Sequence, residues 1–580
     1  MATRPKQKPL TGPHTELTIP RRRVAMLLAG MILLLMLVST RTIWLQSVKN
    51  RTLTQYATNQ QQNTQTLPAV RGAILDRNGK SLAIGEKAVT FVGDPRLIKH
   101  RAATANTVAD VLGLTRGERE ALVERLEAAT GGFVYIARQV PRERAMLLED
   151  KQVRGISWYD EERRMYPSGN VAGQLIGGVN VDGVGIDGIE YLYNRSLTGT
   201  PGQQVSVRDP AGVPIDVRKL VREHDGKPVQ LTIDSVIQGY AERVLQETVK
   251  TYQAESATAI VMDPRTGEIY AIAGVPTVNP AKWSTATGAQ KKLRAVTDVY
   301  EPGSTFKVVA VSGALEDGKV TPQTQKLIPI KRTFCAEKDT CSVKDAHERA
   351  GPEWMSTKDI LVQSSNLGTI AIAETLGKRR FDQWITKFGF GAPTGIDYPG
   401  EERGIRTPVE KWSDVSIGNI PIGQGISVTP IQIATAYATI ANGGLRVQPH
   451  LLKQVGNERS AVYPSRRVLS ERTSREMRTM FGAVVQDDRG TGKEAKIEGY
   501  EVGGKTGTAN VADGANGYSK YKYIASFVGF VPAKNPRLVT LVVVNEPALG
   551  EYGGTVAAPA FEKITQFALT RLAIPPDGVT

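Results

Sequence analysis

An unbroken apolar run near the N-terminus constrains this chain most. Residues 24–38, VAMLLAGMILLLMLV, hold no charged side chain, and three arginines at 21–23 come directly before them. The run alone is shorter than the roughly 20 residues that cross a bilayer. The residues that follow can extend it, because Arg41 can reach toward the far headgroups and Trp44 suits an interface. We therefore predict a single transmembrane helix over residues 24–45.

The tail before this run sets the predicted orientation. Residues 1–23 carry a clear excess of Lys and Arg over one acidic residue, Glu16. Positive flanks stay on the cytoplasmic side of a membrane, so the tail is predicted to be cytoplasmic and the chain beyond about residue 46 extracytoplasmic. A cleaved signal peptide is the alternative, since the run is near signal length. No clear small-x-small cleavage site follows, which favours an uncleaved anchor.

The remaining composition is typical of a globular protein with a sizeable core, since 41% of the 580 residues are hydrophobic and 23% are charged. The net charge of +15 fits either a solvated basic surface or attraction to anionic lipid or an anionic polymer. Aromatic residues make up only 6%, and no nucleic-acid-binding motif occurs, so we expect no nucleic acid partner. Five histidines without metal-ligand spacing, and only two cysteines, predict no metal site, and we expect no cofactor.

Turn and periodicity signals divide the extracytoplasmic part into an elongated α+β unit, residues 46–225, and a second unit, residues 226–580. The predicted features of the first unit are a polar linker at 46–66, a tight turn at Asp76–Gly79 between two short strands, helical periodicity over 102–150 and glycine-rich, strand-like sequence over 163–203.

The second unit begins with a helix for which Asp234 and Ser235 are plausible caps. Two strands around a turn follow at 257–274. Further predicted elements are helices at 305–316, 357–376, 378–388, 429–442 and 558–572, and the strands IASFVGFVP (524–532) and RLVTLVVVNEP (537–547). This order is typical of an α/β layered (α+β) fold in which the two ends of the unit share one sheet.

A phosphate-loop pattern is the first functional candidate, because Gly499, Gly504, Lys505 and Thr506 fit G-x-x-x-x-G-K-[ST]. A phosphate loop must continue into a helix whose N-terminus holds the phosphates. Here Gly507 and a run of Asn, Asp and Gly follow, which predicts a strand end and then a loop. ATP is also scarce outside the cytoplasm, so a nucleotide hydrolase is disfavoured.

Ser304 and Lys307 form the first element of a second candidate. The sequence Glu301-Pro302-Gly303 breaks the preceding structure, and STFKVVAVSGALE is predicted to be helical. Ser304 then lies at a helix N-terminus with Lys307 on the same face, as a serine nucleophile with a lysine base requires. The helix dipole at that end favours a developing oxyanion.

Two further elements follow in the order found in penicillin-interacting serine enzymes. Ser364-Ser365-Asn366 supplies Ser-x-Asn, and Lys505-Thr506-Gly507 supplies Lys-Thr-Gly. The first two elements each have a decoy, Ser519–Lys522 for Ser-x-x-Lys and Ser168–Asn170 for Ser-x-Asn. Order along the chain selects the set that begins at Ser304.

Over nearly its whole length the chain resembles a class B penicillin-binding protein, most nearly a cell-division transpeptidase of the FtsI type. The resemblance is carried by RGAILDRNGKSLA, RRMYPSGNVAGQLIG, GVGIDGIEYLYNRSLTGTPG, YEPGSTFK, SSN, GQGISVTPIQIATAYATIANGG, GKTGTA and YGGTVAAPAF. It implies a non-catalytic pedestal domain at 46–225 and a transpeptidase domain at 226–580, with a β-lactamase-like central antiparallel sheet and helices. One departure is Leu293 in KKLRA, where the family usually has an asparagine.

The resemblance also implies roles for eight residues. Ser304 would attack the penultimate D-alanine of a stem peptide, a neutral Lys307 would take its proton, and Ser364 would relay it to the leaving D-alanine. Asn366 would hold Lys307 and the substrate amide. Lys505 would supply a nearby cation and, with Thr506 and Thr508, bind the terminal carboxylate. Gly507 would leave room for substrate along the strand edge, and the backbone N–H groups of Ser304 and Thr508 would form the oxyanion hole.

The implied reaction cross-links peptidoglycan stem peptides during septal wall synthesis, and β-lactams would acylate the same serine. The implied setting is the plasma (inner) membrane, with an FtsW-type glycosyltransferase and other division proteins as partners. Alternatives left open are an elongation-type transpeptidase, a D,D-carboxypeptidase or β-lactamase-like hydrolase, and a non-enzymatic β-lactam-binding scaffold. Cys335 and Cys341 are predicted to form a short disulfide loop, with two unpaired thiols as the alternative.

Overall fold

The computed structural model describes the chain except for short stretches at both termini and in several loops. The described residues are 21–47, 49, 62–208, 214–335, 342–347, 349–459, 462–512 and 517–577. They fall into two compact units, of which the first comprises 1–67 and 202–222 and the second comprises 68–201 and 223–580.

The first unit holds a long helix and a small sheet. Helix α1 (Arg21–Ser47) has a mean hydropathy of 2.1 in its most apolar stretch and no buried residue, so it fits a membrane anchor by length and composition. The Arg41 guanidinium lies 4.7 Å from the centre of the Trp44 ring, near the far end of the helix. The sheet is antiparallel and consists of β1 (Gln62–Leu67), β8 (Gly202–Arg208) and β9 (Pro214–Val221), in that order.

The N-terminal part of the second unit is a sheet covered by helices. Its strands are β2 (Ile74–Leu75), β3 (Ser81–Gly93), β4 (Val134–Pro141), β5 (Ile156–Met165), β10 (Val229–Leu231), β20 (Leu452–Val455) and β21 (Glu458–Arg459). They lie in the order β21-β20-β10-β2-β3-β4, and β5 also pairs with β3. Helices α3 (Arg101–Leu112), α4 (Arg116–Ala128) and α5 (Arg142–Glu149) share a core with this sheet through Phe91 and Ile136.

The structure confirms the predicted hairpin at Asp76–Gly79 and corrects three other predictions for this region. Asp76 Oδ1 accepts from the backbone N–H groups of Asn78 and Lys80, which closes the turn between β2 and β3. The stretch 46–66 contains most of strand β1, and the helical stretch 102–150 contains strand β4. The stretch 163–203 consists mostly of turns, short helices and one pair of very short strands. They are α6 (Gly173–Ile176), β6 (Gly178–Val179), β7 (Gly185–Asp187), α7 (Gly188–Leu192) and α8 (Asn194–Leu197).

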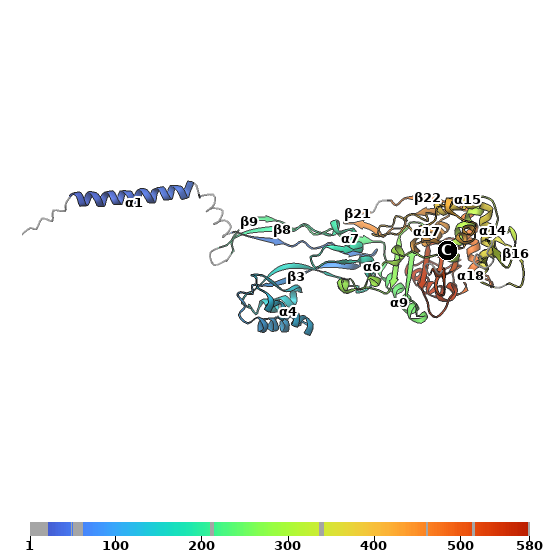
Figure 1. The fold of residues 1–580 in the computed structure, drawn as a ribbon, viewed down its shortest axis with the longest axis horizontal. Helices are drawn as coiled ribbons and strands as arrows, with labels where there is room; N and C mark the ends of the chain where they lie inside the picture. The colour runs from blue at the N-terminus through green and yellow to red at the C-terminus, as the bar shows by residue number, and fades with distance from the viewer. Residues whose placement is uncertain are drawn as a thin grey trace, which may run out of the picture. The chain divides into compact units, whose positions relative to one another are not determined.

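A five-stranded antiparallel sheet forms the centre of the C-terminal part. Its strands are β11 (Ser256–Met262), β12 (Ile269–Val275), β23 (Gly503–Ala512), β24 (Tyr518–Val531) and β25 (Leu538–Asn545). The order is β12-β11-β25-β24-β23, so strands from both ends of this part are neighbours, as the sequence predicted (Figure 1). In the register, Ile260 of β11 lies opposite Leu541 of β25.

Side chains of these strands alternate between two hydrophobic cores. Ala259 and Val261 of β11 belong to the core on one face, whereas Ile260 belongs to the core on the other. Successive residues of a strand point to opposite faces, so an uninterrupted apolar run such as ATAIVM can be buried on both. The first face packs against α9 (Ser235–Tyr252) and α20 (Ala558–Arg571).

The second face carries the helices that hold the candidate site. They are α12 (Lys307–Glu316), α13 (Thr357–Val362), α14 (Asn366–Leu376), α15 (Lys378–Phe388), α17 (Pro430–Ala441) and α18 (Glu471–Gln486). Asp234 caps α9 through hydrogen bonds from Val236 N and Ile237 N, as predicted. The predicted helix 357–376 is wrong in one respect, because it is two helices, α13 and α14, broken at residues 363–365.

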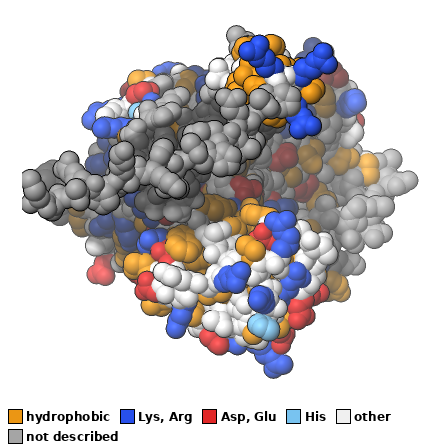
Figure 2. Space-filling view, turned by 90° about the vertical axis from the view of Figure 1, so that its left-hand side faces the viewer, with side chains coloured by type: hydrophobic (Ala, Val, Ile, Leu, Met, Phe, Trp, Pro, Cys, Tyr) orange, Lys and Arg blue, Asp and Glu red, His pale blue; other side chains and the backbone are white. Residues whose placement is uncertain are grey.

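In the lower part of Figure 2, Lys and Arg side chains are scattered among Asp and Glu rather than gathered in one stripe. Cys335 is disulfide-bonded. Cys341 lies outside the described residues, so the bridge between these two cysteines stays a prediction.

Candidate active site

Ser304 lies on a tight turn that leads directly into α12. Residues Gly303–Phe306 form one 3-10 turn, η2, and the α-helix begins at Lys307, so Ser304 precedes the α-helix rather than opening it. Gly303 has φ +54°, and a Cβ built there would lie 2.6 Å from the carbonyl oxygen of Thr508. A glycine is therefore required at this position for the nucleophile turn to approach β23.

Lys307 is fully buried, and its amine is held by the turn between α13 and α14. Lys307 Nζ donates to the carbonyl oxygen of Ser364 at 2.6 Å, to Ser364 Oγ at 3.2 Å and to Asn366 Oδ1 at 2.9 Å. Lys307 and Ser304 are three residues apart, so one turn of helix aims both at the same place. The Ser-x-x-Lys and Ser-x-Asn elements are therefore in contact.

The Ser364 turn is a helix ending of defined geometry. Ser364 N donates to Leu361 O at 3.1 Å, and Ser365 N donates to Ile360 O at 2.8 Å. These two bonds form a Schellman motif, in which the residue after the C-cap is left-handed and usually glycine. Here that residue is Ser364, with φ +57°. The left-handed backbone places its hydroxyl in the centre of the cluster.

Three functional side chains meet at the hydroxyl of Ser364. Ser364 Oγ lies 3.1 Å from Ser304 Oγ, 3.2 Å from Lys307 Nζ and 2.9 Å from Lys505 Nζ. Lys505 comes from β23 and is fully buried, and its amine also donates to the carbonyl oxygen of Thr506 at 3.2 Å. The three sequence elements thus converge on one oxygen atom.

Burial changes the protonation of both lysines. Burial lowers the pKa of Lys307 to about 7, and the negative charge of Asp345 opposes this fall. Burial, and then the charge of Lys307, lower the pKa of Lys505 well below its ordinary value. Two ammonium groups that share one hydroxyl repel each other, so the pair loses a proton more readily than an exposed lysine does. A neutral amine is therefore available near neutral pH, as a lysine base requires.

Strand β23 carries the third element near its beginning, not at its end as the sequence suggested, and it continues to Ala512. It is the edge strand of the sheet, so one side of its backbone is not paired within that sheet. A Cβ at Gly507 would lie 2.3 Å from Ser526 Oγ, 2.9 Å from Thr305 Cγ2 and 3.0 Å from Pro302 O. Glycine is needed there because β23 packs closely on the nucleophile turn, a reason different from the one predicted.

A cavity of about 640 Å³ opens over these residues. Five of the eight predicted site residues line it: Ser304, Ser364, Asn366, Thr506 and Thr508. Thr506 and Thr508 face the cavity because they alternate along β23 with the buried Lys505 and with Gly507. Thr508 Oγ1 accepts from Gly553 N at 3.2 Å, and Thr506 Oγ1 lies 2.9 Å from Thr491 Oγ1.

The decoys occupy different surroundings. The Ser519 hydroxyl accepts from the backbone N–H groups of Tyr521 and Lys522, and the Lys522 amine forms an ion pair with Glu546 at 2.6 Å. Ser168 lies on the turn before α6. Neither serine is among the described residues that line the cavity.

Sequence reasoning missed several residues around the cavity. Charged and titratable side chains on its wall are His347, Arg489, Lys493, Glu494 and Glu551. Asp345 was also missed, although it hydrogen-bonds the Ser364 turn through Asn366 N at 2.6 Å. Its only signal was the short segment KDAHERAG ahead of Ser364 in the chain. The carbonyl oxygen of Gly423 accepts from Gly303 N at 3.1 Å, which ties this glycine to the nucleophile turn.

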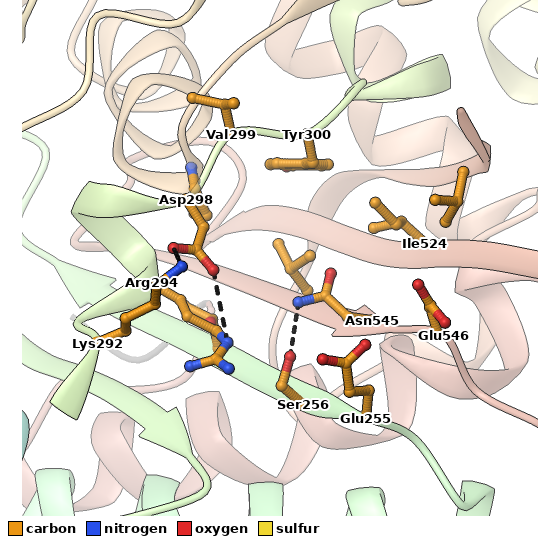
Figure 3. Close-up of a pocket in the computed structure, with 14 residues that line it drawn as sticks. Glu255, Ser256, Lys292, Arg294, Asp298, Val299, Tyr300, Ile524, Asn545 and Glu546 are labelled. Atoms are coloured by element: carbon orange, nitrogen blue, oxygen red, sulfur yellow. Dashed lines mark hydrogen bonds and ion pairs between the residues drawn. The ribbon is translucent and has the colours of Figure 1, made fainter. Parts of the chain in front are cut away.

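A second cavity of about 250 Å³ lies on the other face of β23, since Val511 lines it whereas Asn510 lines the first. Figure 3 shows Lys292 and Arg294 both directed at Asp298, at 3.5 and 3.6 Å. Leu293 between them is buried in the core. The departure from the family pattern thus places an apolar residue in a packed position, and Leu293 is not among the described residues that line the first cavity.

Comparisons with known proteins agree with this architecture. Residues 257–566 match a family described as penicillin binding protein transpeptidase domain, and residues 66–231 match a penicillin-binding protein dimerisation domain. The probable peptidoglycan D,D-transpeptidase PenA of Neisseria meningitidis is 32% identical over 98% of this chain and 95% of its own length. The peptidoglycan D,D-transpeptidase FtsI of Escherichia coli K12 is 32% identical over 96% of this chain and 93% of its own length.

Solved structures show the same fold. Penicillin binding protein 3 from Mycobacterium tuberculosis, complexed with aztreonam, aligns with a TM-score of 0.68 at 29% identity, over 88% of this chain and 98% of that chain. A dimerisation domain followed by a transpeptidase domain, with a serine–lysine cluster at an edge strand, defines the class B architecture of penicillin-interacting enzymes. This chain belongs to the penicillin-binding protein family.

Proposed function

We propose that this protein is a peptidoglycan D,D-transpeptidase that cross-links stem peptides through an acyl group carried on Ser304. The observation that carries the proposal is the convergence of Ser304, Lys307 and Lys505 on the hydroxyl of Ser364, within 3.2 Å in each case. Nucleophile, base and relay must lie within such a distance for proton transfer. The transpeptidase names of relatives over nearly the whole chain support the same reaction.

In the acylation step, Ser304 Oγ attacks the carbonyl carbon of the penultimate D-alanine. The Ser304 proton passes to the neutral Lys307 amine, for which the Ser364 hydroxyl provides a hydrogen-bonded route. The C–N bond to the terminal D-alanine then breaks, and Ser364 delivers a proton to the departing amine. The backbone N–H groups of Ser304 and Thr508 stabilise the oxyanion; their segments touch at Gly303, where only a glycine fits.

In the second step, the amine of another stem peptide attacks the carbonyl carbon of the acyl group, and Lys307 accepts the proton that this amine loses. The ester bond to Ser304 then breaks, and a proton returns to Ser304 Oγ along the hydrogen-bonded route through Ser364. The donor peptide lies along the free edge of β23 as an added strand. Before acylation, its terminal carboxylate is bound by Lys505, Thr506 and Thr508, and its amide contacts Asn366, whose Oδ1 already holds Lys307. β-Lactams acylate the same serine.

The proposed setting is the plasma (inner) membrane, crossed once within α1 by residues 24–45. Residues 1–23 are then cytoplasmic, residues 46–225 form the pedestal domain and residues 226–580 form the transpeptidase domain. The excess of Lys and Arg before α1 supports this orientation. The similarity to FtsI supports septal wall synthesis with an FtsW-type glycosyltransferase and other division proteins. Localising a fluorescent fusion at midcell tests the septal role, and sidewall fluorescence would contradict it.

The test of the active site is covalent labelling. The detergent-solubilised full chain is treated with a fluorescent penicillin, and the labelled peptide is expected to contain Ser304. Ser304→Ala is expected to abolish the label, whereas Ser519→Ala, which removes the decoy serine, is expected to keep it. Label that survives in Ser304→Ala, or that maps to Ser519, contradicts the assignment. A stem-peptide donor with an acceptor amine then separates a cross-linked product from D-alanine release alone.

A further inference from the structure

Asp345 reaches the Ser364 turn from a segment about twenty residues earlier in the chain. Its side chain is only 9% exposed, and it follows the short strand β15 (Ser342–Val343). Asp345 Oδ1 accepts from Asn366 N at 2.6 Å and from Leu367 N at 3.0 Å. These are two of the N–H groups at the start of α14 that the helix itself cannot satisfy.

The other carboxylate oxygen of Asp345 completes the contact. Asp345 Oδ2 accepts from Ser365 Oγ at 2.9 Å and from the Arg349 guanidinium at 2.8 Å. Ser365 Oγ in turn accepts from Gly368 N at 2.9 Å. The carboxylate therefore bonds two successive residues of the Ser-x-Asn element, Ser365 and Asn366, directly after the left-handed Ser364.

The same segment sets the orientation of the Asn366 amide. Asn366 Nδ2 donates to the backbone oxygen of Lys344 at 3.0 Å, which turns Oδ1 toward Lys307 Nζ, 2.9 Å away. The carbonyl oxygen of Ser364, which accepts from Lys307 at 2.6 Å, belongs to the backbone that Asp345 holds. Two of the three acceptors of the Lys307 amine thus depend on residues 344–345.

We propose that Asp345 is a positioning residue for Lys307: its carboxylate holds the Ser364–Asn366 turn where the lysine amine needs its acceptors, and its charge adjusts how readily that amine carries a proton. This inference deepens the proposed function and rests on it. Asp345 acts through Lys307 and the turn, without a contact to substrate.

The charges around the Lys307 amine give the proposal a direction. Lys505 approaches from β23, and Asp345, paired with Arg349, lies behind the Ser364 turn. The cavity wall adds His347, Arg489, Lys493, Glu494 and Glu551. Asp345 is the charge that raises the pKa of Lys307 against the effect of burial. Removing its charge lowers that pKa, whereas removing Arg349 leaves Asp345 unpaired and raises it.

The experiment compares two variants of opposite electrostatic sign. The rate constant for acylation by a fluorescent penicillin is measured over a pH series with the detergent-solubilised full chain. In the plot of acylation rate constant against pH, we expect Asp345→Asn to move the rising acid limb to lower pH by about one unit. We expect its plateau to fall about tenfold or more, because the turn is misplaced. For Arg349→Gln we expect the acid limb to move to higher pH.

The control is Ser365→Ala, which removes a neutral partner of Asp345 and should change the plateau while leaving the acid limb in place. A purely structural role would lower plateaus in all three variants without moving any limb, and that result overturns the proposal. If Asp345→Asn does not fold, the direction of the shift in Arg349→Gln decides. A wild-type chain that takes no label refutes the proposed function itself, whereas unshifted limbs in labelled variants refute only the role of Asp345.

Discussion

The left-handed backbone of Ser364 allows its structural and chemical roles to be separated. Ser364→Ala and Ser364→Gly both remove the hydroxyl that contacts Ser304, Lys307 and Lys505. They differ only in how well they tolerate φ +57° at this position. We expect both variants to lose acylation to the same extent and the glycine variant to be the more stable of the two.

The magnitudes follow from the geometry. A left-handed conformation costs a residue with a Cβ about 1 to 2 kcal/mol, which glycine avoids. Glycine also lowers the free energy of unfolding by about 0.4 to 1 kcal/mol relative to alanine, because the unfolded chain has more conformational freedom with glycine. At the midpoints of these ranges the glycine variant is more stable by about 0.8 kcal/mol. Loss of a proton relay typically lowers a rate by about 10² to 10⁴, and this loss is common to both variants.

Two assays measure these effects. Thermal unfolding, followed by intrinsic fluorescence in detergent, is expected to give the glycine variant a Tm about 1 to 3 °C above that of the alanine variant. A penicillin-labelling time course is expected to give equal, strongly reduced rates. Equal Tm values would refute the argument that Ser364 is strained. Wild-type labelling in either variant would refute its place in the proton route.

Three other predictions can be checked with the same assays. Acylation should rise with pH through about 7, because the Lys307 amine must lose its proton to act as a base; a rate that is flat across this range contradicts that role. Gly507→Ala should slow acylation and destabilise the fold by about 1 to 3 kcal/mol, because the new Cβ would clash with Ser526, Thr305 and Pro302. The control Gly288→Ala, where the Cβ would meet only open space, should change neither the acylation rate nor the stability. Cys335→Ser should lower Tm only slightly, because a disulfide that closes a short loop stabilises the fold by less than the roughly 3 kcal/mol expected for a 15-residue loop. A drop of many degrees would contradict the view that this disulfide holds only its own short loop.

Much of the site could be predicted because its chemistry lies in short local patterns. Ser304 and Lys307 are one helical turn apart, and Lys505 and Gly507 lie on one strand, so spacing alone relates them. The break between α13 and α14 at residues 363–365 could not be predicted from the sequence. The left-handed position of a Schellman motif is usually glycine, whereas here it is Ser364. Asp345 was missed for a different reason: a carboxylate that caps a distant helix leaves no periodic signal.

For the fold as well, elements with a clear local sequence signal could be predicted, whereas strands that depend on distant pairing could not. The apolar runs of β11 and β25 identify strands, and the capping residue Asp234 identifies the start of α9. Strand β4 was hidden because it lies between two helices, α4 and α5, within a stretch that carries helical periodicity. Strand β1 was hidden because its sequence, QNTQTL, is polar, and only its pairing with β8 makes it a strand.

The neighbour relation of β11 and β25 determines when this enzyme can become active. A chain emerges N-terminus first, so β11 and the nucleophile turn appear long before their partners. Ser304 and Ser364 are made early, but Lys505, which contacts Ser364, and Thr508, which lines the cavity, arrive only with β23 later in synthesis. The sheet then closes only when Leu538–Asn545 inserts between β11 and β24. A chain that stalls before these strands therefore carries Ser304 without the complete site around it.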